Sequence, residues 1–155
     1  MIQQGKITNN SLNKTIVCNK KIVDLSSPLV MGIANLTDDS FYDGGCYNDF
    51  ERAKARIDEL VQQKADIIDI GACSTRPGAK LVSAKEEIER LVPVVRYTKK
   101  TYPDSIVSID TVWSEVSRAC VGEGADIIND ISGGSFDSNL FETIAKLDVP
   151  YILMH

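Results

Sequence analysis

The chain has 155 residues, enough for one domain with a substantial core, and 43% of them are hydrophobic and 25% charged. Its net charge is −5 and it contains no basic run, which disfavours nucleic acid and anionic membranes as partners. No apolar run could span a bilayer, and the polar segment 1–19 lacks a signal-peptide core. We expect a cytoplasmic protein with a single domain over residues 1–155.

The four cysteines, Cys18, Cys46, Cys73 and Cys120, are widely spaced and form no Cys-x-x-Cys motif. The one histidine, His155, is the last residue. A zinc site built from these residues is disfavoured, and free thiols in a reducing compartment are the simpler expectation.

The chain begins with two short β-branched segments at residues 15–25, around an Asn-Lys-Lys turn, which predict an N-terminal β-hairpin. An apolar strand at 29–34 runs into a polar loop that ends at 45. A helix is expected at about 48–64, with Asn48 as its cap and Glu51 at the capping-box position.

Strands and helices then alternate along the rest of the chain. Further strands are predicted at 65–70, 105–110, 125–130 and 151–154. A helix from the Ser83–Glu86 capping box to about residue 100 contains Pro93, which should kink it. The remaining helices are expected at about 112–122 and, capped by Asp137, up to about 147.

Short, regular strand–helix units predict either an α/β barrel or an open doubly wound sheet. No Gly-x-Gly-x-x-Gly follows the first strand, which lowers the case for a dinucleotide-binding fold.

Polar residues follow every one of these five strands, at the end where barrel enzymes place their sites. They are Asn35, then Ser74, Thr75 and Arg76, then Asp110, then Asn129 and Asp130, and finally His155. One polar strand end is ordinary turn chemistry, but five in series favour a ligand site.

Each of these residues also has a purely structural interpretation. Asp110 could cap the following helix, or accept hydrogen bonds from an amino-heterocycle. Asn129 could be a turn amide, or present a donor and an acceptor to the same flat ligand. Asn35 could simply end its strand, or its carbonyl could ligate Mg²⁺ beside a diphosphate.

The loops and the strand interiors leave similar alternatives. Arg76 could be a solvated charge or a clamp on a carboxylate or phosphate. Phe41 could pack under its own loop or form the wall of an aromatic site. For Asp69, inside its strand, and for Met154, structural roles are favoured on composition alone. No Ser-His-Asp arrangement or activated cysteine is evident, which favours transfer between two bound substrates.

Five motifs resemble those of dihydropteroate synthases, in the same order. Met-Gly-Ile-Ala-Asn-Leu-Thr-Asp-Asp-Ser-Phe-Tyr-Asp-Gly-Gly at 31–45 resembles the first loop, and Cys-Ser-Thr-Arg-Pro-Gly at 73–78 the second. Ser-Ile-Asp-Thr at 108–111, Ile-Asn-Asp-Ile-Ser-Gly at 128–133 and Leu-Met-His at 153–155 are similar to the next three strand ends. The resemblance covers the chain from about residue 15 to its end.

The resemblance implies a TIM (β/α)8 barrel that joins p-aminobenzoate to 6-hydroxymethyl-7,8-dihydropterin diphosphate in folate biosynthesis. It implies that Asn35 lies at a Mg²⁺–diphosphate site and that Asp110 and Asn129 hold the pterin, with Met154 near its ring. It assigns Thr75, Arg76 and Pro77 to the second mobile loop, and Asp43 to the first loop as this closes over the site.

By the same resemblance, Phe41 and Pro77 help to form the p-aminobenzoate pocket, where sulfonamides compete. Catalysis in the family is dissociative: diphosphate leaves, a pterin cation forms and the amine attacks. Asp43, Arg76 and Asp110 are the residues expected to serve it.

The chain departs from the family in three ways. Asp38 replaces the proline of the first loop, and Cys73 stands where the family commonly has glutamate. A barrel of this type has about 250 residues, so we expect this chain to be the amino-terminal part, with about five of the eight strands.

The later pterin-binding Asp, Lys-x-Ser-Arg-Lys and Arg-x-His of the family are not found in this sequence. The 155-residue chain alone is therefore expected to be inactive, and the full-length protein to be a homodimer. The alternatives are another pterin-binding barrel, such as a methyltetrahydrofolate methyltransferase domain, or a non-catalytic pterin-binding fragment.

Overall fold

The structure, a computed structural model, describes residues 14–18, 21–36, 46–72 and 82–154. A two-stranded antiparallel hairpin comes first, β1 (Thr15–Cys18) and β2 (Lys21–Asp24). A parallel sheet follows, of β3 (Met31–Asn35), β4 (Ile67–Gly71), β5 (Ile106–Asp110), β6 (Ile127–Asp130) and β7 (Tyr151–Leu153). The helices between these strands are α1 (Cys46–Gln62), α2 (Ala84–Thr101), α3 (Ser114–Gly122) and α4 (Leu140–Leu147).

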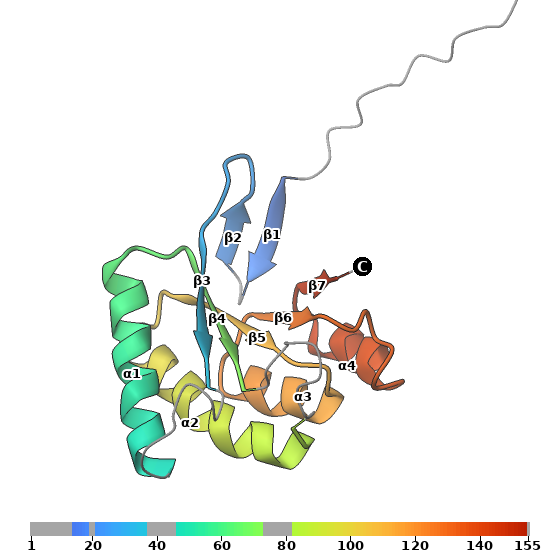
Figure 1. Cartoon of the computed structure of the whole chain (residues 1–155). Coiled ribbons are helices and arrows are strands. Elements are labelled where there is room, and N and C mark those ends of the chain that lie inside the picture. Colours follow the sequence, from blue (N-terminus) through green and yellow to red (C-terminus); the bar gives the residue numbers. More distant parts are fainter. Residues whose placement is uncertain (1–13, 19–20, 37–45, 73–81, 155) are drawn as a thin grey trace, which may run out of the picture.

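The order of the strands in the sheet decides between the two predicted architectures. The sheet runs β3-β4-β5-β6-β7, so each strand pairs with the next along the chain (Figure 1). A doubly wound sheet would reverse this order at a switch point. Consecutive parallel strands with intervening helices are the arrangement of a TIM barrel, and the predicted five-strand α/β fold with an N-terminal hairpin is confirmed.

All four helices pack on one face of the sheet. The strand residues on this face are small or β-branched and almost fully buried: Ala34, Ile68, Ile70, Val107, Ile109 and Ile128. They form one core cluster with helix residues that include Ala53, Ile57, Leu91, Val95, Val116 and Leu140. Alternation along each strand therefore sends the intervening residues to the opposite face.

The hairpin packs at the end of the sheet where the strands begin (Figure 1). Cys18 of β1 is buried in a second apolar cluster with Ile67 and Ile127, which lie on the face away from the helices. This leaves the carboxyl ends of the strands, at the opposite end, as the polar end of the sheet.

Several local predictions are confirmed and others are wrong. The Ser83–Glu86 capping box opens α2. Asn48 does not cap α1, because the helix already begins at Cys46. Asp137 does not cap α4 but accepts the backbone N–H of Ser114 at 2.8 Å, at the start of α3.

Within the described ranges, no helix combines the length and the apolar character needed to cross a membrane. Two of the four cysteines, Cys18 and Cys120, lie in the described ranges as free, buried thiols.

Candidate active site

Three of the predicted site residues lie in one row at the carboxyl end of the sheet. In the parallel register Asn35 pairs with Gly71, and Gly71 with Asp110. Asp110 in turn pairs with Asn129. Residues in register on neighbouring strands share a face, and this row lies on the face away from the helices. The register therefore brings a carboxylate and two amides, from three separate strands, to one edge.

Gly71 is the member of the row that keeps the space open. A methyl group added at Gly71 would lie 3.1 Å from Asn35 Oδ1 and 3.3 Å from Asp110 Oδ2. It would also lie 3.2 Å from Asp110 Cβ, and such distances are tighter than ordinary packing. A glycine here therefore lets the Asn35 amide oxygen and the Asp110 carboxylate approach from its two sides.

Asp69, for which the sequence favoured a structural role, lies one layer deeper than the row on the same face of the sheet. Its side chain is 5% exposed, and its Oδ2 accepts a hydrogen bond from Asn129 Nδ2 at 3.2 Å. Its Oδ1 and the Oγ of its register neighbour Ser108 are buried, and neither has a hydrogen-bond partner among the described residues. In the sequence, Asp69 is marked only as an ionisable residue in the middle of an otherwise apolar strand.

Two buried oxygens on this face that no described residue satisfies call for a hydrogen-bond partner, which a ligand, water or a further part of the chain could supply. Asp69 also fixes the orientation of the Asn129 amide, because that amide donates to its carboxylate.

The pKa of Asp110 is raised from its ordinary value to about 6. Burial is the main cause, and the nearby carboxylates of Asp69 and Asp130 add to it. A carboxylate that gains or loses its proton near neutral pH, at the mouth of a barrel, is typical of a functional group. Its negative charge can accept hydrogen bonds from the N–H edge of a heterocycle and offset positive charge on the ring.

Asp130 turns away from this row, toward the helices. Its Oδ1 accepts the backbone N–H of Ser132 at 2.6 Å, and its Oδ2 that of Gly134 at 2.7 Å. The Tyr151 hydroxyl also donates to Oδ2 at 2.7 Å. Asp130 therefore shapes the loop after β6, where Gly133 and Gly134 have positive φ angles of 58° and 79°.

Met154 follows β7 directly, and its side chain is 51% exposed. Its backbone N–H donates to the Asp130 carbonyl at 3.2 Å, and its own carbonyl oxygen lies close to Gly133. The residue therefore lies beside the loop after β6, at the carboxyl end of the sheet.

The remaining predicted site residues, Phe41, Asp43, Thr75, Arg76 and Pro77, lie outside the described residues, as do Asp38, Cys73 and His155. Their described neighbours Leu36 and Ala72 are buried directly after β3 and β4, at the same end of the sheet as the row.

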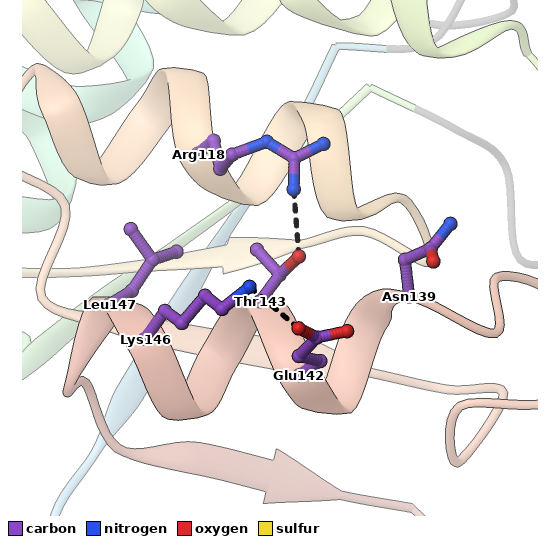
Figure 2. A pocket seen from close by; sticks show the side chains of 6 residues that line it. All are labelled: Arg118, Asn139, Glu142, Thr143, Lys146 and Leu147. Atoms are coloured by element: carbon purple, nitrogen blue, oxygen red, sulfur yellow. Dashed lines mark hydrogen bonds and ion pairs between the residues drawn. The ribbon is translucent and has the colours of Figure 1, made fainter.

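A surface hollow elsewhere on the molecule is distinct from this row. It has a volume of about 240 Å³ and lies between α3 and α4, lined by Arg118, Asn139, Glu142, Thr143, Lys146 and Leu147 (Figure 2). Arg118 donates to the Thr143 hydroxyl at 2.7 Å across it. None of its lining residues belongs to a strand, so the hollow plays no part in the site at the strand ends.

The part of the chain that the structure describes contains no cluster of three or more His, Cys, Asp and Glu side chains able to hold a metal. Asn35, whose side chain is exposed at the end of β3, offers one amide oxygen. Mg²⁺ is commonly held by one or two protein oxygens, with substrate phosphates and water completing its coordination. The single amide oxygen of Asn35 therefore suits an ion that brings most of its own ligands, as Mg²⁺ bound to phosphates and water does.

Residues 31–155 match the family model described as "Pterin binding enzyme". The chain belongs to this family. The matched residues include all five parallel strands, and with them Asn35, Asp69, Asp110 and Asn129.

Within the pterin-binding family, the chain resembles dihydropteroate synthases. It is 44% identical to the dihydropteroate synthase of Streptococcus pyogenes serotype M1 over 135 residues, which cover 87% of this chain and 50% of that protein. It is 46% identical over 126 residues to the folic acid synthesis protein fol1 of Pneumocystis carinii, covering 81% of this chain and 17% of that protein.

Solved structures give the same result. The dihydropteroate synthase of Xanthomonas albilineans with 4-aminobenzoic acid matches with a TM-score of 0.84 and 40% identity, over 92% of this chain and 52% of that chain. The Yersinia pestis enzyme in a sulfonamide drug complex matches with a TM-score of 0.79 and 40% identity, over 91% and 50%. The chain thus spans about half the length of the bacterial synthases that it matches.

Proposed function

We propose that this chain forms the pterin-binding side of a dihydropteroate synthase, a transferase of folate biosynthesis. The observation that carries the proposal is the row of Asn35, Gly71, Asp110 and Asn129 on one edge of the sheet, with Asp69 beneath it. A carboxylate and an amide side by side complement the alternating donors and acceptors of a flat amino-heterocycle. The similarity to dihydropteroate synthases over most of the chain supports this choice of ring.

In the proposed reaction, the C–O bond of the pterin diphosphate breaks and the diphosphate leaves with the bonding electrons. The amine of p-aminobenzoate then forms the new N–C bond and loses a proton, which gives dihydropteroate. Positive charge on the pterin builds up as diphosphate departs. We propose that the carboxylates of Asp110 and Asp69 stabilise that charge.

Magnesium would neutralise charge on the diphosphate, and Asn35 is the residue that would hold it. Phe41 and Pro77 are proposed to contact p-aminobenzoate, Thr75 and Arg76 to act from the second loop, Asp43 from the first loop, and Met154 to lie near the pterin ring. The Coxiella burnetii enzyme was solved with pteroic acid and that of Burkholderia cenocepacia with 7,8-dihydropteroate, in line with such a site. We further propose that the whole enzyme is a cytoplasmic homodimer and that the 155-residue chain alone does not turn over.

Binding of 6-hydroxymethylpterin to the purified chain, followed by its fluorescence, tests the proposal. We expect saturable binding that Asp110→Asn weakens by at least about tenfold, because Asn presents an NH₂ donor where one of the two acceptor oxygens of the carboxylate stood. Asp148→Asn is the matched control, since Asp148 is exposed at the end of α4 in the left-handed conformation that Asn tolerates. Equal binding by wild type and Asp110→Asn would exclude the proposed ring site, and dihydropteroate formation by the chain alone would overturn the proposed inactivity.

A further inference from the structure

Glu87 is a fully buried carboxylate that the proposed reaction does not use. It lies in the first turn of α2 and its side chain is 1% exposed. Lys, Glu, Arg and Asp are almost never buried to this degree unless paired. Glu87 is therefore not simply a solvent-exposed charge on the surface of α2, and its burial needs an explanation.

The contacts of Glu87 lead directly to Asp110. Glu87 Oε2 accepts a hydrogen bond from the hydroxyl of Thr111 at 2.7 Å. Thr111 is the residue immediately after Asp110, and its own backbone N–H donates to the carbonyl of Asn129 at 3.0 Å. Its hydroxyl oxygen also accepts the backbone N–H of Trp113 at 3.2 Å. Thr111 thus connects Glu87 on α2 to the end of β5 and to β6, the strands that carry Asp110 and Asn129.

We propose that Glu87 is a positioning residue that holds Asp110 and Asn129 in register for the pterin, acting through the Thr111 hydroxyl. This inference rests on the proposed role of Asp110 and Asn129. The inference extends that role, because the relative position of Asp110 and Asn129 would then depend on Glu87 in the first turn of α2.

The electrostatics of Glu87 agree with this arrangement. Its pKa is raised to about 7, chiefly by burial and further by the Asp110 charge, while the Thr111 hydrogen bond and the Arg90 charge oppose the rise. On α3, the Cys120 thiol also faces it, and burial with the Glu87 charge raises the pKa of that thiol to about 12. Both carboxyls, Glu87 and Asp110, are therefore expected to change charge near neutral pH.

The affinity for 6-hydroxymethylpterin between pH 5 and 8 tests the inference. In wild type we expect affinity to rise with pH as the Asp110 and Glu87 carboxyls, whose pKa values are both raised by burial, become negative. Glu87→Gln should change this pH profile, because one of the two titrating groups is removed, whereas the matched control Glu89→Gln, on the exposed side of the same helix, should keep it. A Glu87→Gln profile that superimposes on that of wild type would overturn the inference.

The hydrogen bond is tested separately at Thr111. Thr111→Val should weaken pterin binding by about tenfold, the effect of losing a hydrogen bond to a charged group, and Thr111→Ser should restore it. Circular dichroism and the unfolding midpoint identify variants that fail to fold. Binding by a folded Thr111→Val at the wild-type affinity would contradict the proposed link.

A measurement without ligand separates this inference from the proposed function. Carbon-13 NMR of the Glu87 carboxyl in wild type and Asp110→Asn should show a lower Glu87 pKa in the variant, because a negative neighbour has been removed. If 6-hydroxymethylpterin does not bind at all, the proposed function fails, and with it the ligand-holding part of the inference. An identical Glu87 pKa in both proteins overturns the coupling between Glu87 and Asp110 even if pterin binds.

Discussion

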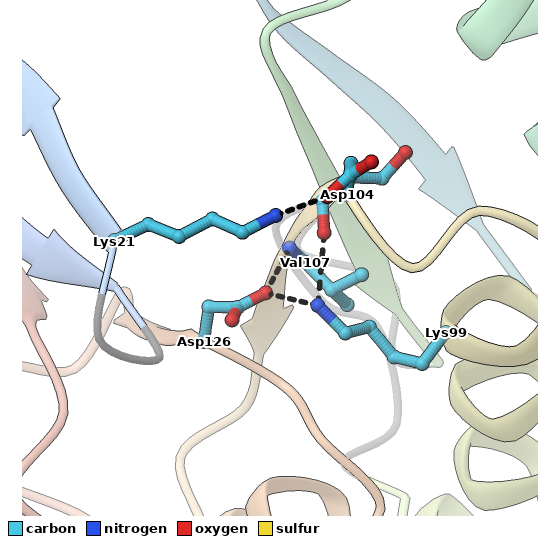
Figure 3. A network of polar contacts seen from close by, with 6 residues as sticks. Lys21, Lys99, Asp104, Val107 and Asp126 are labelled. Carbon is cyan, nitrogen blue, oxygen red and sulfur yellow. Dashed lines mark hydrogen bonds and ion pairs between the residues drawn. The ribbon is translucent and has the colours of Figure 1, made fainter.

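The buried ion pair between Lys99 and Asp126 should make a large contribution to stability. Lys99 Nζ lies 2.9 Å from Asp126 Oδ2, and the two side chains are only 14% and 3% exposed (Figure 3). The same carboxylate oxygen accepts the Val107 backbone N–H at 2.8 Å, and Lys99 also donates to the Ser105 carbonyl at 2.9 Å. The pair therefore ties α2 to the start of β5 and to the residues before β6.

Asp126→Asn keeps an oxygen for the Val107 N–H but leaves the Lys99 charge buried without its partner. Breaking a buried pair on one side costs about 3 to 5 kcal/mol. Domains of this size typically have an unfolding free energy of about 5 to 15 kcal/mol, so the loss should amount to at least about a fifth of the stability. Adding Lys99→Met to this variant should recover part of the loss, because the unpaired charge is then removed.

Urea unfolding followed by circular dichroism measures the effect. The matched control is Asp104→Asn, which breaks the neighbouring pair between Lys21 and Asp104 (Figure 3). The side chains of that pair are 49% and 95% exposed, so its loss should hardly move the unfolding midpoint. The account of the buried pair is refuted if Asp126→Asn lowers the midpoint no more than Asp104→Asn does.

Three further variants probe the site and its support. Gly71→Ala should weaken pterin binding severalfold, as seen by fluorescence titration, because its methyl group presses on both flanking side chains. Gly122→Ala should leave binding unchanged, because a methyl group there would meet no described atom within 4 Å outside its own helix backbone and chain neighbours. Tyr151→Phe removes one of the three hydrogen bonds that described residues donate to the buried Asp130 carboxylate, and it should cost about 1 kcal/mol in urea unfolding. A loss near zero would contradict that role. The pKa of Glu87 rises on folding from 4.5 to about 7. Its contribution to stability is therefore fully present below pH 4.5 and is lost as the pH rises through 7. Over that range, the unfolding free energy of wild type relative to Glu87→Gln should fall by up to about 3 kcal/mol in urea unfolding.

The order and type of the elements could be predicted from sequence because the strands are apolar at nearly every position. Ile68 and Ile70 are buried on the helix face of one strand, and Ile67 is buried on its opposite face. Helix starts were harder to predict. Asn48 has the chemistry of a cap, but the helix extends to Cys46, and Asp137 caps α3 across space because α3 and α4 are neighbours.

The row of site residues was predictable in its members but not in its geometry. Polar residues at successive strand ends pointed to Asn35, Asp110 and Asn129. Only the register shows that Gly71 separates Asn35 from Asp110, and that Asn129 donates to Asp69. Likewise, Glu87 is an ordinary first-turn glutamate in the sequence, and its burial follows from the packing of α2 against the end of β5.

An NMR titration of the chain with 6-hydroxymethylpterin would show whether the ring binds at the carboxyl end of the sheet. We expect saturable shifts of the Asn129 side-chain amide and the Asp110 and Thr111 backbone amides, while Arg118 in the hollow between α3 and α4 stays unchanged. The proposed site would be contradicted if saturating pterin shifted the signals of Arg118 and left those of Asn129 and Asp110 unchanged.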